Sequence, residues 1–521
     1  MKDLSGENLT GRRLLPYACI LAAAVLVYFR TVFFGFTWYD DNLLIVDSLP
    51  FISKLSNIPA AFTQQVFANT HYYRPLLTIS FMLNAAIAGA SPFIYHLSNI
   101  ALHACAAMTL FYFLRLWGHI TRFALAAALL FSVHPAAGQA VAWIPGRNDI
   151  LLAIFSLLSF SCFMRGLTGQ RRAFWLHLLF YFCALLTKEN AAVLPGLLAC
   201  YAFYIRPGGR WPVSPGRTAW LWAAVTFAWL ACRWFALGAL SGAAPAAGLS
   251  FLHSFQAALT YIGRAVFPYG LTVMPVLENM SLAPGIIAAV LLTAFICCAS
   301  TDRRKSVFGA AWFLAFLLPT MNRHLSAGFI EFGDHRIYTS LAGLFLLAGD
   351  ARFPAAAKTA AAALLLPLFA GISFSRLPVF QDSVSFWEGA LKGSPSSLVL
   401  RIKLGSVYLK AGRCPQALAQ FSAALETRPD DVALNMNMGN CLLACGDAVR
   451  AAFFWEKALT ADPGNAQALR NIALFYCSKN NFREAARYVE KLLAAGEEVN
   501  ENILADTAKY RRTQRPVSRR F

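Results

Sequence analysis

Residues 14–42, LLPYACILAAAVLVYFRTVFFGFTWYDDN, decide the fold class of this chain. The apolar run from Leu14 to Phe29 follows two arginines and resembles a secretory signal. Because no small-residue cleavage site follows it and more apolar runs do, we expect an uncleaved signal anchor with a cytoplasmic N-terminus. The acidic pair Asp40 and Asp41 comes shortly after the run. Ionisable groups close to the hydrocarbon are costly and usually mark a substrate site or an ion path.

Composition predicts a polytopic membrane protein. Of the 521 residues, 58% are hydrophobic and only 14% are charged, and the mean hydropathy is +0.52. Apolar runs recur faster than one soluble core could absorb them. After the first run they lie near residues 94–117, 123–133, 150–164, 174–186, 191–205, 219–240, 285–299, 307–320, 337–348 and 355–374. We therefore predict about eleven transmembrane helices, several of them shorter than the roughly 20 residues of a full span.

Basic residues fall on alternate connections between these runs, as the positive-inside rule demands. Those near residues 115–122, 165–172, 206–217, 303–305 and 352–358 share one side with the N-terminus. This topology explains the net charge of +19 better than nucleic-acid binding does, since no basic helix or zinc-ligand spacing accompanies it. Acidic residues, Glu331 among them, gather on the other side. Acids contribute little to orientation, so we expect a functional face there.

One apolar segment, Ser254 to Leu271, does not fit the count. Treating it as a full span would put the basic cluster at residues 303–305 on the wrong side. We predict a re-entrant or interfacial segment that lines a cavity.

Beyond Phe374 the sequence repeats with a period of 34 residues. Three columns of the repeat are Gly405, Gly439 and Ala473; Ala417, Ala451 and Ala485; and Pro395, Pro429 and Pro463. Small residues at helix contacts and a Pro after the second helix, at this period, are the tetratricopeptide signature. Such helix pairs stack into a superhelix whose concave groove commonly holds an extended peptide. An odd number of spans places the repeats on the same side of the membrane as Asp40.

These features resemble the transmembrane and tetratricopeptide-repeat-containing O-mannosyltransferases, within the GT-C class of polyprenyl-phosphate-sugar glycosyltransferases. The resemblance covers nearly the whole chain and rests on the order and spacing of its motifs among the spans. Besides residues 36–42 (FTWYDDN) these are residues 72–76 (YYRPL), Tyr95-His96 with Asn99 and His103, Val133-His134-Pro135, residues 146–149 (GRND), Lys188-Glu189, Phe267-Pro268 with Gly270-Leu271, and residues 335–338 (HRIY). The chain departs from the family at residues 334–336, where the family usually shows Glu-Arg.

The resemblance implies an all-α protein, with a GT-C-type membrane domain at residues 1–376, tetratricopeptide repeats at 377–500 and a basic, disordered tail at 501–521. It implies transfer of mannose or a similar hexose from a polyprenyl-phosphate sugar to Ser or Thr hydroxyls of exported proteins. The reaction would invert the anomeric centre, with a carboxylate of the first external loop as base. The compact length fits a bacterial inner membrane, with the repeats on the outer side.

The chemistry needs a base near the acceptor hydroxyl and cations near the leaving phosphate, which departs without a strong acid. We predict Asp40 as the base, and Asp41 as a group that orients the acceptor or raises the pKa of its neighbour. For either carboxylate the alternative is capping of a short helix. Arg74 and Arg336 are candidates for the phosphate, since a guanidinium fork matches its oxygens. The alternative for these two is snorkelling at the membrane surface.

The remaining substrate-binding candidates come from the same motifs. Arg147 with Asp149, and Lys188 with Glu189, each set opposite charges at the external end of a span, where an internal ion pair is the alternative. The other four candidates are Tyr73, His96, His335 and Tyr338. No Cys or acidic residue joins the histidines at a metal-like spacing, so we predict no essential metal and no cofactor besides the lipid-linked donor.

Two readings remain beside protein O-glycosylation. One is a glycosyltransferase that acts on a glycan or lipid acceptor. The other is a non-enzymatic scaffold or transporter with protein-binding repeats, although the internal symmetry common in secondary transporters is not seen. Cysteines of the repeats would bridge in an oxidising compartment, but core packing is their default role.

Overall fold

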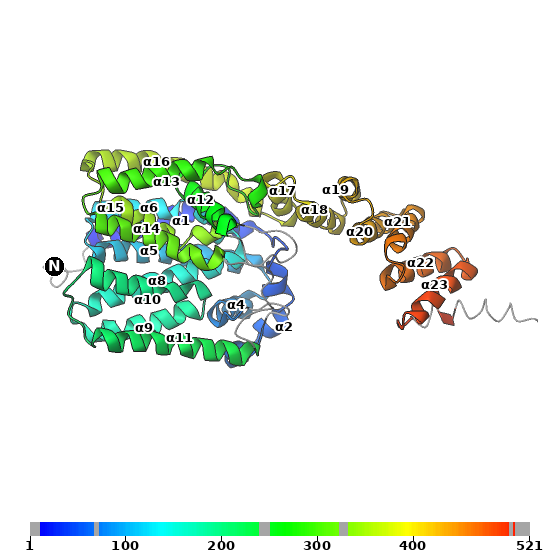
Figure 1. Ribbon diagram of the computed structural model, residues 1–521, viewed down its shortest axis with the longest axis horizontal. Coiled ribbons are helices and arrows are strands. Elements are labelled where there is room, and N and C mark those ends of the chain that lie inside the picture. The colour runs from blue at the N-terminus through cyan, green and yellow to red at the C-terminus, as the bar shows by residue number, and fades with distance from the viewer. Residues whose placement is uncertain (1–10, 67–71, 239–250, 322–331, 500–503, 506–521) are drawn as a thin grey trace, which may run out of the picture. The chain divides into compact units, whose positions relative to one another are not determined.

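The computed structural model describes residues 11–66, 72–238, 251–321, 332–499 and 504–505, and these residues form helices joined by loops, without a β-strand (Figure 1). Contacts divide the chain into two compact units, residues 1–393 and 394–521. Glu331 and the basic tail from Lys509 to Arg520 lie outside the described residues. The predicted domain boundaries stay a prediction.

The first unit is built from antiparallel helices and short helical turns. Its α-helices are α1 (Gly11–Tyr28), α2 (Leu49–Ile52), α3 (Ile58–Thr63), α4 (Pro75–Ala88), α5 (Pro92–Trp117), α6 (Thr121–Ser132), α7 (Gly138–Ala142), α8 (Arg147–Gly166), α9 (Arg171–Leu185), α10 (Leu194–Cys200), α11 (Pro215–Leu237), α12 (Phe251–Val266), α13 (Ala283–Ala294), α14 (Arg303–Met321), α15 (Leu341–Gly349), α16 (Ala355–Arg376) and α17 (Ser383–Gly393). Its shorter helices are η1 (Phe29–Phe33), η2 (Asn42–Val46), η3 (Leu55–Asn57), η4 (Pro135–Ala137), η5 (Ile144–Gly146), η6 (Glu189–Val193), η7 (Tyr201–Ile205), η8 (Leu277–Asn279), η9 (Phe295–Ala299), η10 (Asp334–Ile337) and η11 (Leu377–Phe380).

Each apolar run predicted from the sequence forms helix, and the chain has the all-α, polytopic membrane architecture that the runs predict. Among the described residues, five helical segments are long and apolar enough to cross a membrane, or six if the pair α6 and η4–α7, bent by 49°, forms one span. This is fewer than the predicted number of about eleven. Most of the other apolar runs form shorter helices, and the 19-residue α14 begins with three basic residues. Large apolar side chains on the long helices face outward: Trp220 is 78% exposed, Phe227 72% and Leu364 71%. The hydrocarbon core of a membrane would cover these side chains.

The basic connections meet at one end of this unit. Backbone bridges join Thr168 to Arg210 and Ser300 to Ala351, and the Arg304 guanidinium lies 5.6 Å from the centre of the Tyr204 ring. Four of the connections that carry the predicted basic residues therefore lie at one end of the unit. The orientation of this end in a membrane stays a prediction.

The external segment between α1 and α5, expected as a loop, contains η2, α2, η3, α3 and the apolar helix α4. The segment predicted to be re-entrant or interfacial, Ser254 to Leu271, forms the 16-residue helix α12 and a turn. Helix α12 packs closely on α13, because a Cβ atom at Gly285 would lie 2.1 Å from the carbonyl oxygen of Leu259. Its Arg264 contributes to a buried ion cluster described below.

The second unit consists of three antiparallel helix pairs. They are α18 (Leu398–Lys410) with α19 (Cys414–Thr427), α20 (Val432–Ala444) with α21 (Ala448–Ala461), and α22 (Ala466–Ser478) with α23 (Phe482–Ala494). The 34-residue period is structural: Ser397, Asp431 and Asn465 each cap the first helix of a pair through a side-chain oxygen. Gly412, Gly446 and Asn480 end these helices with positive φ. Gly439 has no room for a side chain, since a Cβ atom there would lie 2.4 Å from Trp455 Nε1.

A disulfide joins Cys414 at the start of α19 to Cys445 after α20, with 5.8 Å between their Cα atoms. The bridge links the first two helix pairs. Cys441 and Cys477, the other repeat cysteines, take no part in a disulfide.

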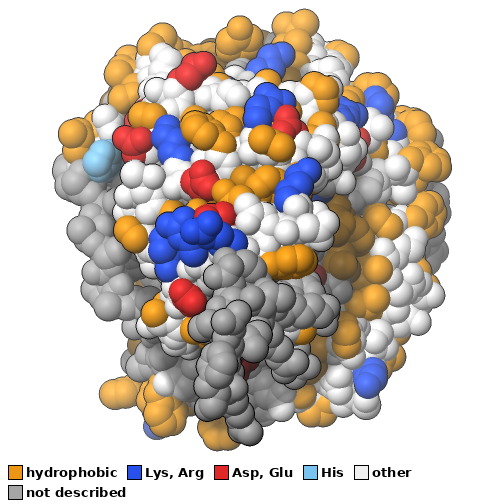
Figure 2. Space-filling view, turned by 90° about the vertical axis from the view of Figure 1, so that its right-hand side faces the viewer, with side chains coloured by type: hydrophobic (Ala, Val, Ile, Leu, Met, Phe, Trp, Pro, Cys, Tyr) orange, Lys and Arg blue, Asp and Glu red, His pale blue; other side chains and the backbone are white. Residues whose placement is uncertain are grey.

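Acidic and basic side chains are interspersed on the face seen in Figure 2, with hydrophobic side chains between them. The described residues on this face do not form the single-sign basic surface that nucleic-acid binding favours.

Candidate active site

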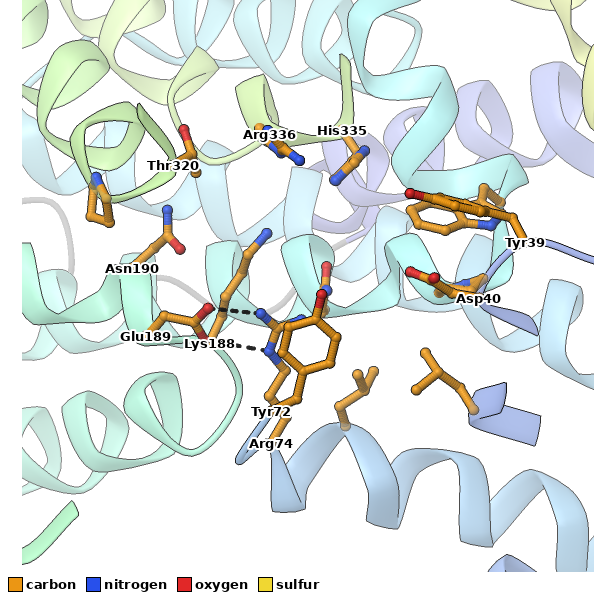
Figure 3. Close-up of a pocket in the computed structure, with 16 residues that line it drawn as sticks. Tyr39, Asp40, Tyr72, Arg74, Lys188, Glu189, Asn190, Thr320, His335 and Arg336 are labelled. Atoms are coloured by element: carbon orange, nitrogen blue, oxygen red, sulfur yellow. Dashed lines mark hydrogen bonds and ion pairs between the residues drawn. The ribbon is translucent and has the colours of Figure 1, made fainter. Parts of the chain in front are cut away.

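A cavity of about 770 Å³, counting its open mouth, lies in the first unit at the end opposite the basic loops. It is lined by Tyr39, Asp40, Leu44, Tyr72, Arg74, Leu77, Trp143, Pro145, Asn148, Lys188, Glu189, Asn190, Pro319, Thr320, His335 and Arg336. These residues come from six separate stretches of the chain (Figure 3). The cavity thus brings together six of the predicted site residues: Asp40, Arg74, Lys188, Glu189, His335 and Arg336.

The acidic pair is divided between two environments. Asp40 faces the cavity (Figure 3), whereas the Asp41 side chain is buried and turned toward Thr37. The backbone N–H of Thr37 donates to Asp41 Oδ2 at 2.6 Å, and the Thr37 hydroxyl donates to the same oxygen. These bonds close a turn in which Trp38 has a φ of +54°, an uncommon value for a residue with a Cβ atom. Asp41 therefore holds the turn that presents Asp40.

Burial raises the pKa of Asp41 from 3.8 to about 6, although the hydrogen bonds from Thr37 lower it. Desolvation disfavours the charged carboxylate more strongly than the two donors of Thr37 and the backbone N–H of Trp38 favour it. The predicted role of Asp41 in orienting the acceptor stays a prediction, and the described geometry places its carboxylate outside the cavity lining.

Tyr39 is held by aromatic rings on both faces. Its ring stacks on Trp143 at a centroid distance of 5.6 Å and on Phe386 of α17 at 5.9 Å. Trp387 contacts it edge-on at 5.7 Å, and Trp143 in turn lies 5.2 Å from the ring of His335. The residue beside Asp40 is therefore fixed by α17, the last helix of the first unit.

The ion pairs of the site differ from those that sequence neighbours indicate. Lys188 Nζ lies 2.7 Å from Asp149 Oδ1, and both side chains are buried. Arg74 donates twice to Glu189, at 2.8 and 3.4 Å. The alternative of internal ion pairs thus holds for Lys188, Asp149 and Glu189, but their partners come from other parts of the chain instead of from sequence neighbours. The roles of these residues in substrate binding stay a prediction. Burial lowers the pKa of Lys188, and the Asp149 carboxylate opposes that shift.

The Arg74–Glu189 pair lies at the cavity rim. The Glu189 side chain is 41% exposed and that of Arg74 only 6%. The Arg74 guanidinium also lies 4.2 Å from the centre of the Tyr72 ring, an attractive cation–π geometry. Solvent screens such a pair, so its contribution to stability is small. Glu189 occupies the Nε–Nη2 edge of the Arg74 guanidinium and fixes its position at the rim.

Arg147 is fully buried and serves the scaffold instead of the cavity surface. Its guanidinium donates to the Asn99 side-chain oxygen at 2.7 Å, to the Tyr95 carbonyl at 2.8 Å and to the Ser80 carbonyl at 3.1 Å. Helices α4, α5 and α8 are tied together by this one side chain.

Three more predicted site residues lie outside the cavity lining. The Tyr73 hydroxyl donates to the Phe62 carbonyl at 3.0 Å. His96 is buried against Phe34, with 6.2 Å between ring centres. Tyr338 is buried and shares a 2.7 Å hydrogen bond with His103 Nδ1. Their contacts are those of packing and polar bonds between helices.

His335 and Arg336 reach the cavity from η10, which a buried ion cluster anchors. Asp334 lies 2.7 Å from Arg264 of α12 and 3.2 Å from Arg376 of α16. The Gln139 side-chain oxygen also accepts from the His335 backbone N–H at 3.2 Å. Helices α12 and α16 therefore fix the segment that carries Arg336.

Several polar or aromatic lining residues were not among the predicted site residues: Tyr72, Trp143, Asn148, Asn190 and Thr320. Asn148 and Asn190 could have been found, since each adjoins a charged motif. In the described part of the chain, no three His, Cys, Asp or Glu side chains lie close enough to hold a metal ion. The absence of an essential metal stays a prediction.

Parts of this chain are similar to known proteins. The Tetratricopeptide repeat family model matches residues 402–466. Protein O-mannosyl-transferase TMTC2 of Mus musculus is 35% identical over 149 residues, which are 26% of this chain and 17% of that protein. Protein O-mannosyl-transferase Tmtc1 of Drosophila melanogaster is 31% identical over 200 residues, 37% of this chain and 23% of that protein. The predicted resemblance is confirmed, and this chain spans less than a quarter of the length of these relatives.

Among solved structures, ArnT from Cupriavidus metallidurans bound to undecaprenyl phosphate is similar over 90% of this chain and 81% of its own. The identity is 14% and the TM-score 0.44. YrrB, a tetratricopeptide-repeat protein with an unusual peptide-binding site, is 23% identical over 27% of this chain and 75% of its own, with a TM-score of 0.21.

Proposed function

We propose that this protein is an integral membrane glycosyltransferase that moves mannose or a similar hexose from a polyprenyl-phosphate carrier to Ser or Thr hydroxyls of exported polypeptides. The observation that carries the proposal is the cavity, where Asp40 faces Arg74, Lys188 and Arg336. A carboxylate opposite several cations suits a reaction that takes a proton from one substrate and releases a phosphate from the other.

In the proposed step the acceptor oxygen attacks C1 of the sugar while its proton passes to the Asp40 carboxylate. The bond from C1 to the phosphate oxygen breaks, and its electron pair leaves with the polyprenyl phosphate. Arg74 and Arg336 would bind that anion, since a guanidinium fork suits phosphate oxygens. Attack from the face opposite the phosphate inverts the anomeric centre. No external acid or cofactor is needed to balance the step.

The second unit would deliver the acceptor. Tetratricopeptide grooves commonly bind extended peptides, and the family model matches 65 of these residues, 402–466. The Cys414–Cys445 bridge supports a location of the repeats on an oxidising side of the membrane, such as the outer face of a bacterial inner membrane. Exported polypeptides are found on that side.

The test uses the purified full chain in lipid nanodiscs, polyprenyl-phosphate mannose and a Ser/Thr-rich peptide. Asp40→Asn should lower kcat about 10²- to 10⁴-fold, the range for loss of a general base. Asp41→Asn is the matched control and should keep most of the activity, because its amide oxygen still accepts from Thr37. Full activity in Asp40→Asn would overturn the assignment of the base. If mannose never reaches the peptide but does reach a glycan or lipid, the acceptor class is wrong.

A further inference from the structure

Trp38 lies two residues before Asp40, in a turn whose neighbouring side chains are packed. The buried hydroxyl of Thr37 donates to Asp41, and the ring of Tyr39 is held between two other aromatic rings. The Trp38 side chain, in contrast, is 47% exposed. A rigid turn therefore carries a large aromatic ring at the protein surface.

The backbone of Trp38 is also unusual. Among the described residues, Trp38 and Asn480 are the two non-glycine residues with a positive φ, at +54° and +56°. Asn480 follows the end of α22, and asparagine tolerates this conformation. Tryptophan is bulky and does not. The Trp38 backbone N–H donates to Asp41, but glycine would keep that bond and adopt the same φ without a steric cost. Residues held in such conformations cluster at active sites.

The turn places the indole at the edge of the charged cavity, because the next two residues, Tyr39 and Asp40, line it. Figure 3 shows Arg74 and Lys188 on one side of the cavity and Tyr39 with Asp40 on the other. Two residues of extended chain span at most about 7 Å. A polypeptide that brings a hydroxyl to Asp40 therefore brings its adjoining residues within reach of Trp38.

The alternative surrounding for an exposed indole is the membrane surface, where tryptophans gather. The path of the chain argues against it. Phe33 is 77% exposed, but Phe34 is buried, and the backbone N–H of Gly35 donates to the carbonyl of Gln381 at 2.8 Å. The chain thus turns into the unit before it reaches Trp38. The indole emerges beside the cavity instead of on the outward face of a long helix.

We propose that Trp38 binds the acceptor polypeptide next to the residue that receives the sugar. An indole offers a large, rigid apolar face and an N–H donor, and it loses little conformational entropy on binding. These properties suit an extended segment of variable sequence. The inference rests on the proposed function for the reaction and extends it to the recognition of the acceptor. The contact makes a hydroxyl within a polypeptide a better acceptor than the same hydroxyl on a single amino acid.

The first test compares a Ser/Thr-rich peptide with N-acetylthreonine amide as acceptors for the full chain in lipid nanodiscs. Trp38→Gly removes the ring and accepts the φ of the turn. The ratio of kcat/KM for the peptide to kcat/KM for the amide should fall by about tenfold or more, as expected for an interface tryptophan, mainly through a higher KM for the peptide. Trp38→Phe keeps an aromatic face and should retain most of the ratio.

The matched control is Trp220→Ala, at a 78% exposed site of α11, which should leave the ratio as it is in the natural protein. An equal loss for both acceptors in Trp38→Gly would mean that the residue acts through Asp40, and an unchanged ratio would mean that it does not meet the acceptor. Either result overturns the inference. If Trp38→Gly does not give a monodisperse protein, Trp38→Asn serves in its place, because asparagine also tolerates this φ.

Photocrosslinking tests the contact without sugar transfer. Benzoylphenylalanine is incorporated at the position of Trp38 or, as the control, of Trp220, and the protein is irradiated with a biotinylated Ser/Thr-rich peptide. We expect crosslinked peptide at the first position only, and its loss with an excess of unlabelled peptide. Crosslinks to lipid instead of peptide at the first position would mean an anchor in the membrane surface and overturn the inference.

The two experiments separate this inference from the proposed function. Competed crosslinks without sugar transfer from any donor would show that the protein is not the proposed enzyme, while the contact between Trp38 and the polypeptide stands. Sugar transfer whose preference for the peptide survives Trp38→Gly would leave the enzyme in place and remove the contact.

Discussion

Asp40 and Asp41 are adjacent in the chain, yet the buried carboxylate of Asp41 accepts from Thr37, whereas Asp40 faces the cavity. The turn before them contains Trp38 with a positive φ. The sequence alone could not assign these roles. Either carboxylate could have capped the turn, and the choice depends on backbone geometry that no pattern of residue types records.

The Asp41 carboxyl should make stability depend on pH. Its pKa of about 6 in the folded protein exceeds the 3.8 of an ordinary aspartate, so the folded state holds a proton that the unfolded chain has released. Stability is therefore fully present below about pH 4 and falls as pH rises to about 6, by roughly 2 to 3 kcal/mol for this group. Asp41→Asn cannot titrate and should unfold at a higher temperature than the natural protein at pH 7, but not at pH 4. If the unfolding temperatures of the two proteins change with pH in the same way between pH 4 and pH 7, this prediction is wrong.

The buried pair Lys188–Asp149 should show strong coupling. Lys188→Met leaves an unpaired carboxylate in the interior and should cost about 3 to 5 kcal/mol. Adding Asp149→Leu removes that charge and should recover much of the loss. Thermal unfolding of the two single variants and the double variant measures the coupling. Additive effects would mean that the two charges do not interact in the folded protein.

Helix α17 is the last helix of the first unit, and it contacts the segment that carries Asp40. Its Phe386 covers one face of Tyr39, and the carbonyl of Gln381, just before the helix, accepts from the backbone N–H of Gly35 at 2.8 Å. The chain continues from α17 directly into the repeats. The helix that leads to the proposed acceptor-binding unit is therefore the same helix that fixes the position of the residue beside Asp40.

Phe386→Leu should lower kcat with little change in the KM for the donor, because Tyr39 loses a stacking partner while the volume is largely kept. Aromatic stacking contributes about 0.5 to 1.5 kcal/mol, which corresponds to roughly a two- to tenfold change in rate. Phe453→Leu, at a 60% exposed site of α21, is the control. If Phe386→Leu lowers kcat by the same factor in protein that already carries Tyr39→Leu, the two rings act independently.

At the level of elements, the apolar runs predicted helix well, since hydrophobic length alone determines that signal. The helix α4 was missed because its 14 residues begin with Pro75 inside a stretch rich in polar and aromatic side chains. The ion pairs of the site join residues that are far apart in the sequence. Partner choice depends on which helices pack together, and no local pattern shows that Asp149 of α8 meets Lys188 before η6.

For the whole molecule, the repeats were the most predictable part. The predicted period of 34 residues recurs in the helix caps Ser397, Asp431 and Asn465, which were not themselves predicted. The disulfide was not predictable, because four cysteines of the repeats left the pairing open. Cys414 and Cys445 come together only when the first two helix pairs stack.

The Cys414–Cys445 bridge, whose cysteines are 31 residues apart, should stabilise the repeats by about 4 kcal/mol, the value that loop-closure entropy gives for a loop of this length. Reduction of the full chain should lower the temperature at which the repeats unfold, and Cys414→Ser should show the same lower temperature with or without reductant. Cys477→Ser, outside the bridge, should still respond to reductant. If both thiols are alkylated in protein isolated without reductant, the repeats do not lie in an oxidising compartment.

The buried guanidinium of Arg147 gives the cavity a permanent positive electrostatic potential. In the described residues its hydrogen bonds end on neutral oxygens of Asn99, Tyr95 and Ser80, so no carboxylate cancels its charge, and its neighbour Asn148 lines the cavity. A buried cation keeps more of its electrostatic field than an exposed one when mobile ions screen the protein surface. Attraction of an anionic lipid head should consequently survive high salt, and the protein could work in media of very different ionic strength.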